Sequence, residues 1–261
     1  MDLDTKPLLL SNRLADLRLD PFCFFCVDDY LPADLYEELH ASYPDGPEYG
    51  ADSEGKLGFR SSEDPGSVER FCREHPAWGQ IFAFFRSDEF LADARAVLAE
   101  PLRRARRGWP GRRPWYNGNT RPIPNNWLHY QLQEPVATTF QFSQLSRDAV
   151  VTPHADAPRK LLTLLLYFRE PEWRDEWGGA TEYYAPLDPV RARAWGATDR
   201  IPFEEFKPIG STGYVANRLA GFVRASNSFH GVEPVSSPVG LARKAFMINV
   251  KRVKWSKRKK L

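Results

Sequence analysis

The chain has 261 residues, of which 42% are hydrophobic, 27% charged and 13% aromatic. This apolar content excludes a disordered chain, and the length fits one large domain or two small ones; we expect one domain over residues 1–261. The longest apolar runs, such as Leu164–Leu166 with its neighbours, are far shorter than the roughly 18 residues needed to span a bilayer, which excludes a transmembrane protein.

The start of the chain and its cysteines predict a cellular location. Asp2 and Asp4 make the first residues acidic, where a secretory signal would be basic. The chain contains 3 cysteines, too few for a disulfide framework at this length. Both observations favour the reducing environment of the cytoplasm.

Positive charge is concentrated at the C-terminal end. Residues 251–261 contain seven Lys and Arg residues and no acid, so the rest of the chain carries a net charge of −5 within the total of +2. A mildly acidic body is not typical of a nucleic-acid-binding domain. The tail Lys251–Lys260, which includes Trp255, suits peripheral contact with an anionic membrane or with RNA, or is simply a solvated terminus.

The N-terminal part predicts a strand, a helix and a long loop. Residues Phe22–Val27 are apolar and aromatic, as in a short strand. Pro32 suits the first turn of a helix whose apolar residues recur every four positions until Pro44 ends it. The polar, glycine-containing segment that follows predicts a loop to about Ser67.

Two further helices are predicted before the middle of the chain. Apolar residues between Trp78 and Phe85 fit one helical face, and Ser87 is the predicted N-cap of the next helix. A group of arginines then predicts a helix end that leads into a long loop, which is either a substrate lid or a solvated surface. The group consists of Arg103, Arg104, Arg106, Arg107, Arg112 and Arg113.

From Asn126 onward the pattern changes to strands. Apolar and β-branched segments without intervening helices favour a sandwich or barrel closed by antiparallel pairing. The predicted strands are Thr138–Leu145, Leu161–Phe168, Thr181–Tyr184, Leu219–Val223 and Ala245–Val250.

Two histidines and an aspartate in this strand-rich half suit metal binding. His154 and Asp156 lie two residues apart at the end of a predicted strand, so both side chains point to one face. His230 is the best third ligand because it directly follows another strand-like segment. Two histidines and one carboxylate on one face of a metal leave its other positions open, as in non-haem Fe(II) oxygenases. Taken alone, the pattern also fits polar residues that are hydrogen-bonded at strand ends.

Cys23, Cys26, Cys72 and His75 form a second candidate set, because three thiols and an imidazole suit Zn²⁺. Cys23 and Cys26 are three residues apart in the predicted strand and therefore face opposite sides. This spacing favours small buried residues over a zinc site.

His154, Asp156 and His230 belong to a series of motifs that occur in a definite order along the chain. These are His154-Ala-Asp156, Leu164–Phe168, Trp177–Glu182, His230–Val235 and Arg243. As a set they resemble the Fe(II)/2-oxoglutarate-dependent dioxygenases, closest to the prolyl 4-hydroxylase-like branch. The resemblance covers about Phe140 to Val250, and Phe22 to Pro44 is similar to the N-terminal region of the same branch.

The resemblance implies a mainly β fold with α: a double-stranded β-helix, or jelly roll, flanked by N-terminal helices. We therefore expect a helical support region at about 28–110, a jelly-roll core at about 126–250 and the basic tail at 251–261.

The resemblance also implies residue roles. His154, Asp156 and His230 match the iron ligands of the family. Arg243 matches the basic residue that holds the far carboxylate of 2-oxoglutarate, a task that suits the planar pair of donors on a guanidinium. Lys244 is the weaker candidate, because a neighbouring residue in a strand points to the opposite face.

One position departs from the family pattern. Several relatives have a hydroxyl residue two positions after this arginine, where this chain has Ala245. We expect Thr163 or Tyr130 to supply the missing hydrogen bond to 2-oxoglutarate. The carboxylate of Asp156, which halogenating relatives lack, favours hydroxylation over halogenation.

The implied activity uses Fe(II), 2-oxoglutarate and dioxygen to hydroxylate an unactivated C–H bond, with release of succinate and carbon dioxide. The residues after Arg243 lack the arginine and asparagine spacing of nucleobase demethylases, which argues against that activity. The remaining substrates are an amino acid or peptide side chain, or a membrane-associated glycan or polar head group. Two alternatives stay open: a non-catalytic metal-binding jelly-roll module, and a cupin-like metal isomerase or hydrolase that would not need Arg243.

Overall fold

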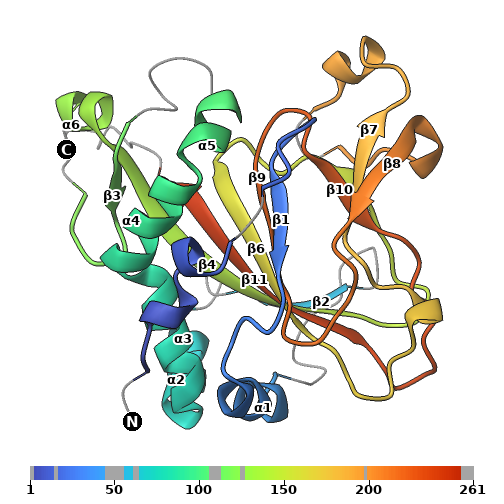
Figure 1. Cartoon of the computed structure of the whole chain (residues 1–261), viewed down its shortest axis with the longest axis horizontal. Coiled ribbons are helices and arrows are strands. Elements are labelled where there is room, and N and C mark those ends of the chain that lie inside the picture. Colours follow the sequence, from blue (N-terminus) through green and yellow to red (C-terminus); the bar gives the residue numbers. More distant parts are fainter. Residues whose placement is uncertain are drawn as a thin grey trace.

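Figure 1 shows the computed structural model of the chain. The C-terminal tail beyond Val253 and part of the arginine group, Arg106–Arg112, lie outside the described residues. The predicted membrane or RNA contact and the predicted lid therefore stay predictions. The structure describes residues 3–14, 17–44, 56–60, 65–105, 113–123, 127–196 and 199–253.

Helices precede most of the strands in the chain, as predicted. Ser87 is the expected N-cap: its hydroxyl accepts a hydrogen bond of 3.0 Å from the Phe90 N–H. No helix among the described residues combines the length and the apolar character needed to cross a membrane. The α-helices are α1 (Ala33–Ala41), α2 (Pro65–Glu74), α3 (Pro76–Arg86), α4 (Asp88–Val97), α5 (Ala99–Ala105) and α6 (Trp127–Leu132), and the 3-10 helices are Lys6–Leu8, Leu10–Asn12, Asp175–Trp177, Arg191–Ala194 and Phe203–Glu205.

The strands form two sheets. The large sheet has seven strands in the order β1-β9-β6-β11-β4-β2, with β3 also paired to β4. The small sheet has the order β5-β10-β7-β8, and β5 forms one of its edges. The bounds are β1 (Phe24–Val27), β2 (Lys56–Arg60), β3 (Trp115–Asn117), β4 (Glu134–Leu145), β5 (Val151–His154), β6 (Lys160–Phe168), β7 (Glu182–Pro186), β8 (Phe206–Ser211), β9 (Leu219–Val223), β10 (Phe229–Val232) and β11 (Arg243–Arg252).

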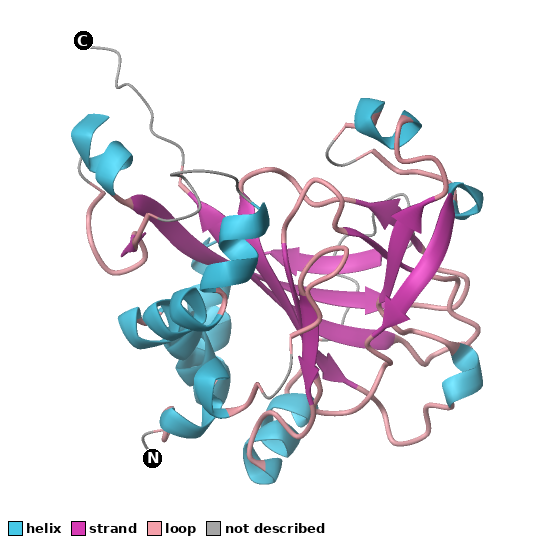
Figure 2. Cartoon of the chain, turned by 45° about the horizontal axis from the view of Figure 1, so that its top comes forward, coloured by secondary structure: helices cyan, strands magenta, loops and turns pink. Residues whose placement is uncertain are grey.

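The large sheet separates a helical layer from the interior between the two sheets. Figure 2 shows most of the helices gathered on one side of the strands. On β11, Phe246 and Ile248 face the helices and join a core with Trp78 of α3. The alternating residue Ala245 faces the opposite way, into a second core between the sheets. This two-residue period decides which side chains of the large sheet can reach the interior.

This arrangement confirms the predicted fold class, a jelly roll supported by N-terminal helices. The prediction of a continuous loop to about Ser67 is wrong, because β2 and the first residues of α2 lie within it. The strand β2 lies at the sheet edge, paired antiparallel to β4. Its formation depends on that long-range pairing, which the polar local sequence does not reveal. The short helix α6 likewise lies in the region predicted to contain only strands.

Candidate metal centre

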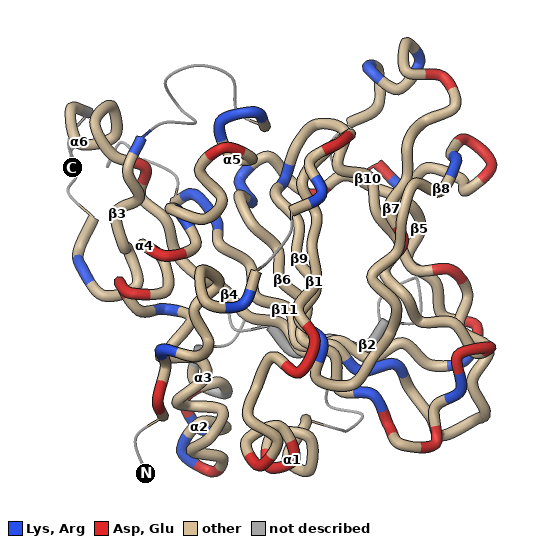
Figure 3. Tube along the Cα trace, viewed as in Figure 1, with Lys and Arg blue, Asp and Glu red and all other residues tan. Residues whose placement is uncertain are grey.

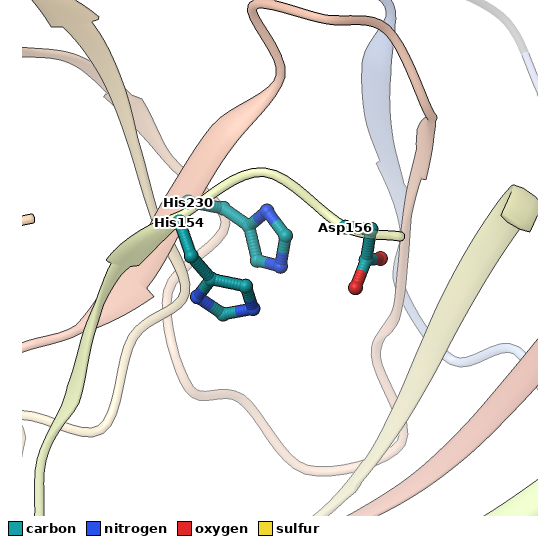
Figure 4. Close-up of side chains that lie close together, drawn as sticks. All are labelled: His154, Asp156 and His230. Carbon is teal, nitrogen blue, oxygen red and sulfur yellow. The ribbon is translucent and has the colours of Figure 1, made fainter. Parts of the chain in front are cut away.

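The two candidate histidines lie on neighbouring strands of the small sheet. His154 is the last residue of β5 and is paired across the ladder with His230 of β10, which brings the ring centroids to 4.5 Å. Figure 4 shows the two rings side by side and Asp156 facing them from the segment after β5. The pairing of β5 with β10 therefore brings together residues that are far apart in the sequence.

The three side chains converge on one point. One ligand atom from each of His154, Asp156 and His230 lies within 4.8 Å of the other two. Asp156 is 5% exposed and His230 is 9% exposed, so the carboxylate and the second imidazole are largely removed from water. Two imidazoles and one carboxylate are a donor set that fits Fe(II) with open positions for other ligands.

Backbone carbonyl groups orient both imidazoles. The Nδ1 atom of His154 lies 3.0 Å from the Thr152 oxygen, and that of His230 lies 3.0 Å from the Ser228 oxygen. A hydrogen on Nδ1 satisfies each contact and leaves Nε2 as the ligand atom. Burial lowers the pKa of both histidines, and the neighbouring imidazole of His230 lowers that of His154 further. Both rings are thus kept in the neutral form that binds metal.

The Asp156 carboxylate is held at both oxygens. Lys160 Nζ donates to Oδ1 at 2.6 Å, and the Thr163 hydroxyl donates to Oδ2 at 2.9 Å. Arg224 Nε also donates to the Asp156 backbone oxygen, at 3.0 Å. Burial by itself would raise the pKa of Asp156, but the nearby cation Lys160, which also donates a hydrogen bond to the carboxylate, lowers that pKa overall. The carboxylate is therefore ionised and fixed in direction.

A cavity of about 270 Å³ connects this centre with Arg243. Arg243 is 2% exposed, and its guanidinium carbon lies 5.1 Å from the Tyr167 ring centroid and 5.5 Å from that of Tyr214. Its Nε donates to the Gly179 oxygen and its Nη2 donates to the Thr181 hydroxyl oxygen at 3.1 Å. A buried guanidinium at a cavity wall is a site for a carboxylate.

Gly179 shows why the Trp177–Glu182 motif contains glycine. Its φ is +92°, a region that residues with a side chain rarely adopt. An added Cβ would also lie 3.2 Å from the Tyr214 ring and 3.4 Å from Cδ of Arg243. The glycine thus allows the chain to pass close to the guanidinium.

Lys244 points away from the cavity, as the alternation predicts. Its Nζ donates to Glu170 at 2.6 Å on the helical side of the sheet and lies 5.7 Å from the Tyr43 ring centroid. The prediction that Arg243, not Lys244, faces the interior is confirmed.

The two predicted hydroxyl donors lie in different places. Thr163 lines the cavity but donates to Asp156, and it also lies 3.3 Å from the Asn249 side-chain oxygen. Tyr130 belongs to α6, which lies across the molecule from β10 (Figure 1), and it is not among the residues that line the cavity. The expectation of Tyr130 at the site is therefore corrected, because α6 packs beside β3 and β4 instead.

Sequence reasoning missed the hydroxyl that does lie beside Arg243. Thr181 lines the cavity and accepts from Arg243, and it also accepts a hydrogen bond of 2.7 Å from the Tyr167 hydroxyl. No local pattern marked Thr181 for this role, because the role depends on a contact with Arg243, 62 positions away in the chain.

The alternative zinc site is not formed. Among the described residues, His154, Asp156 and His230 are the only group of three or more His, Cys, Asp and Glu residues close enough to share a metal ion. Cys23 is buried and Cys26 is exposed, which agrees with their predicted opposite directions.

The chain is similar to solved structures, although comparisons of its sequence find no match. No family model and no curated protein match the chain. A prolyl-4-hydroxylase from Pseudomonas putida is similar in structure with a TM-score of 0.52 and 17% identity, over 95% of this chain and 99% of that one. A Trichoplax adhaerens prolyl hydroxylase, solved with a hypoxia inducible factor peptide fragment, is similar with a TM-score of 0.54 and 14% identity, over 95% of this chain and 91% of that one. This chain has the prolyl hydroxylase fold. HygX from Streptomyces hygroscopicus, solved with nickel and 2-oxoglutarate, matches with a TM-score of 0.48 and 11% identity, over 88% of this chain and 83% of that one.

Proposed function

We propose that this protein is an Fe(II)- and 2-oxoglutarate-dependent dioxygenase that hydroxylates an unactivated C–H bond. The observation that carries the proposal is one cavity with two histidines and a carboxylate at one wall and a buried arginine at another. The overall reaction takes 2-oxoglutarate, dioxygen and substrate to succinate, carbon dioxide and hydroxylated substrate. The prolyl hydroxylase fold is consistent with this reaction.

Six of the residues that line the cavity have a role in the proposal. His154, Asp156 and His230 hold Fe(II), which supplies the oxygen chemistry when bound. Arg243 binds the far carboxylate of 2-oxoglutarate and thereby orients its keto acid end toward the metal. Thr163 and Lys160 keep the Asp156 carboxylate directed at the ion. The substrate is an amino acid or peptide side chain, or a membrane-associated glycan or polar head group.

The deciding experiment is an assay of succinate formation. The protein is supplied with Fe(II), 2-oxoglutarate, air and pools of amino acids, short peptides and glycolipids. We expect wild-type protein to form succinate with at least one pool, and His230→Ala to form none because one metal ligand is missing. Wild-type protein that binds the metal but forms no succinate with any pool would instead support a non-catalytic binding module.

Arg243→Ala separates the oxygenase from a cupin-like isomerase or hydrolase. We expect weaker 2-oxoglutarate binding, measured by calorimetry, by about 10- to 100-fold, because a charge-assisted pair is lost. Metal content, measured by elemental analysis, should not change. Lys244→Ala is the matched control, since this neighbouring cation faces Glu170 on the other side of the sheet. Unchanged 2-oxoglutarate affinity in Arg243→Ala would contradict the oxygenase.

A further inference from the structure

A short helix at one end of the molecule exposes two leucines. Leu128 and Leu132 of α6 are one helical turn apart, and 57% and 54% of their surfaces are exposed. Figure 1 shows α6 at a corner of the molecule, away from β7, β8 and β10. Single exposed apolar residues are common, whereas two large ones on one face of a helix indicate a surface that binds a partner.

The end of β11 lies close to this helix. Arg252 pairs with Val136 of β4, and the Val253 N–H donates to the Pro135 oxygen at 2.9 Å. Pro135 is three residues after Leu132, the last residue of α6. Residues 254–261 therefore continue from a point near α6.

Positive charge is in excess around this helix. The chain has no Asp or Glu between Glu100 and Glu134, so α6 and the residues before it add no negative charge. Glu134 itself forms ion pairs with Arg113 at 2.6 Å and with Arg252 at 2.5 Å, which neutralise its carboxylate. Residues 254–261 contribute five Lys and Arg residues and no acid. This end of the molecule therefore attracts an anionic partner.

Nucleic acid and anionic lipid are two partners with dense negative charge, and the exposed leucines favour lipid. Aliphatic side chains insert among lipid head groups and acyl chains. Nucleic acid is bound instead by stacking on aromatic residues and by polar contacts. Trp255, in the basic segment 254–261, is of a residue type that is enriched at membrane interfaces.

We propose that α6 and residues 254–261 form a membrane-binding surface for bilayers that contain acidic phospholipids. Leu128 and Leu132 insert at the level of the head groups, and the Lys and Arg residues of the basic segment bind the negatively charged head groups. One weak signal gives only marginal membrane binding, whereas an apolar and a basic element together give stable binding. Neither leucine lines the cavity, and the proposal does not depend on the proposed function.

The test measures binding of the full chain to vesicles by co-sedimentation. One set of vesicles is phosphatidylcholine alone, and the other also contains phosphatidylserine. We expect wild-type protein to bind the anionic vesicles about tenfold more tightly or better, and the difference to shrink in high salt because the attraction is screened. Equal binding to both sets overturns the proposal.

Leu128→Ser combined with Leu132→Ser should weaken binding to the anionic vesicles by about tenfold, because less apolar surface leaves water. Leu187→Ser combined with Val190→Ser is the matched control, since these residues are 61% and 72% exposed on the segment that follows β7. Both double variants replace exposed residues, and urea unfolding checks that they are folded. Unchanged binding by the α6 variant, or an equal loss in the control, overturns the proposal.

Lys257→Gln, Arg258→Gln and Lys259→Gln, combined in one variant, should weaken binding by about 100-fold, since each substitution removes an attraction to the head groups. Wild-type affinity of this variant for the anionic vesicles also overturns the proposal. A single-stranded RNA oligonucleotide is the last comparison. RNA that binds more tightly than the vesicles, with no effect of the α6 substitutions, identifies nucleic acid as the partner and contradicts the membrane-binding surface.

Discussion

The hydroxyl groups near Arg243 are arranged around a single oxygen atom. Thr181 Oγ1 accepts hydrogen bonds from the Tyr167 hydroxyl and from Arg243, which occupies both of its lone pairs. Its own hydrogen is therefore directed elsewhere, and Thr181 lines the cavity. Thr181 thus provides a donor beside Arg243, where Ala245 provides none.

Thr181→Val should weaken 2-oxoglutarate binding by about tenfold, because a hydrogen bond to a charged carboxylate is lost without a change in volume. Isothermal calorimetry of the metal-loaded protein measures the effect. Thr138→Val is the control: Thr138 is also buried, but its hydroxyl donates to the Phe85 oxygen on the helical side. Equal 2-oxoglutarate affinity in Thr181→Val and wild-type protein would show that Thr181 does not contact the co-substrate.

Sequence reasoning succeeded for residues that belong to short motifs. His154 and Asp156 are two residues apart in one motif, and they converge in the structure although Asp156 lies just beyond the end of β5. Thr181 could not be chosen this way, because its role depends on a contact with Arg243 that spans 62 positions of the chain. Tyr130 was wrongly expected at the site because a tyrosine hydroxyl suits the predicted hydrogen bond. Only the position of α6 in the structure shows that this hydroxyl lies elsewhere.

At the scale of elements, the metal centre depends on the close approach of β5 and β10. Gly231 follows His230, and an added Cβ there would lie 2.5 Å from the Val151 backbone oxygen of β5. A backbone oxygen cannot move aside as a flexible side chain can. The glycine is therefore a condition for the pairing that sets His230 beside His154.

Gly231→Ala should push β10 away from β5, lower metal affinity by about tenfold and destabilise the fold by about 1–3 kcal/mol. A competition titration with a metal-binding dye reports the affinity. Gly79→Ala in α3 serves for comparison, because its nearest neighbour would be 3.4 Å away and alanine favours a helix. Wild-type metal affinity in Gly231→Ala would mean that the spacing of these two strands does not determine the site.

The elements themselves were predictable to different degrees. β9 spans the predicted residues 219–223, and β6 differs by one residue, because both are continuously apolar and buried. β2 and β3 were missed, since each is a short strand that pairs with β4 in the structure. Local sequence carries little information about strands that form only on a long-range partner.

At the scale of the whole molecule, charged residues are distributed along the chain, while the candidate metal centre lies between the two sheets. Figure 3 shows acidic and basic residues interspersed along most of the chain. The strand β11 joins the two interior regions: Phe246 packs into the helical core, and Arg243 faces the cavity. Packing in the helical core and the proposed binding of 2-oxoglutarate thus involve opposite faces of one strand.

Phe246→Ala should lower the free energy of unfolding by about 3–5 kcal/mol, as for other large buried aromatic residues. Its ring centroid lies 5.0 Å from that of Trp78 and 5.0 Å from that of Phe142, so the truncation leaves a cavity in the helical core. Urea unfolding measures the change, and metal affinity in the absence of urea should be close to that of wild-type protein. A loss of metal affinity comparable to that of His230→Ala would show that the two cores are not independent.

The edge position of β5 has a consequence for self-association. In an antiparallel strand the backbone N and O atoms of one residue point to the same side. The Pro153 oxygen already accepts a hydrogen bond from the Ile201 N–H, and the Pro153 nitrogen on the same side has no hydrogen to donate. A strand from a second molecule finds neither donor nor acceptor at this residue. The strand that carries His154 is thereby blocked against edge-to-edge growth into aggregates.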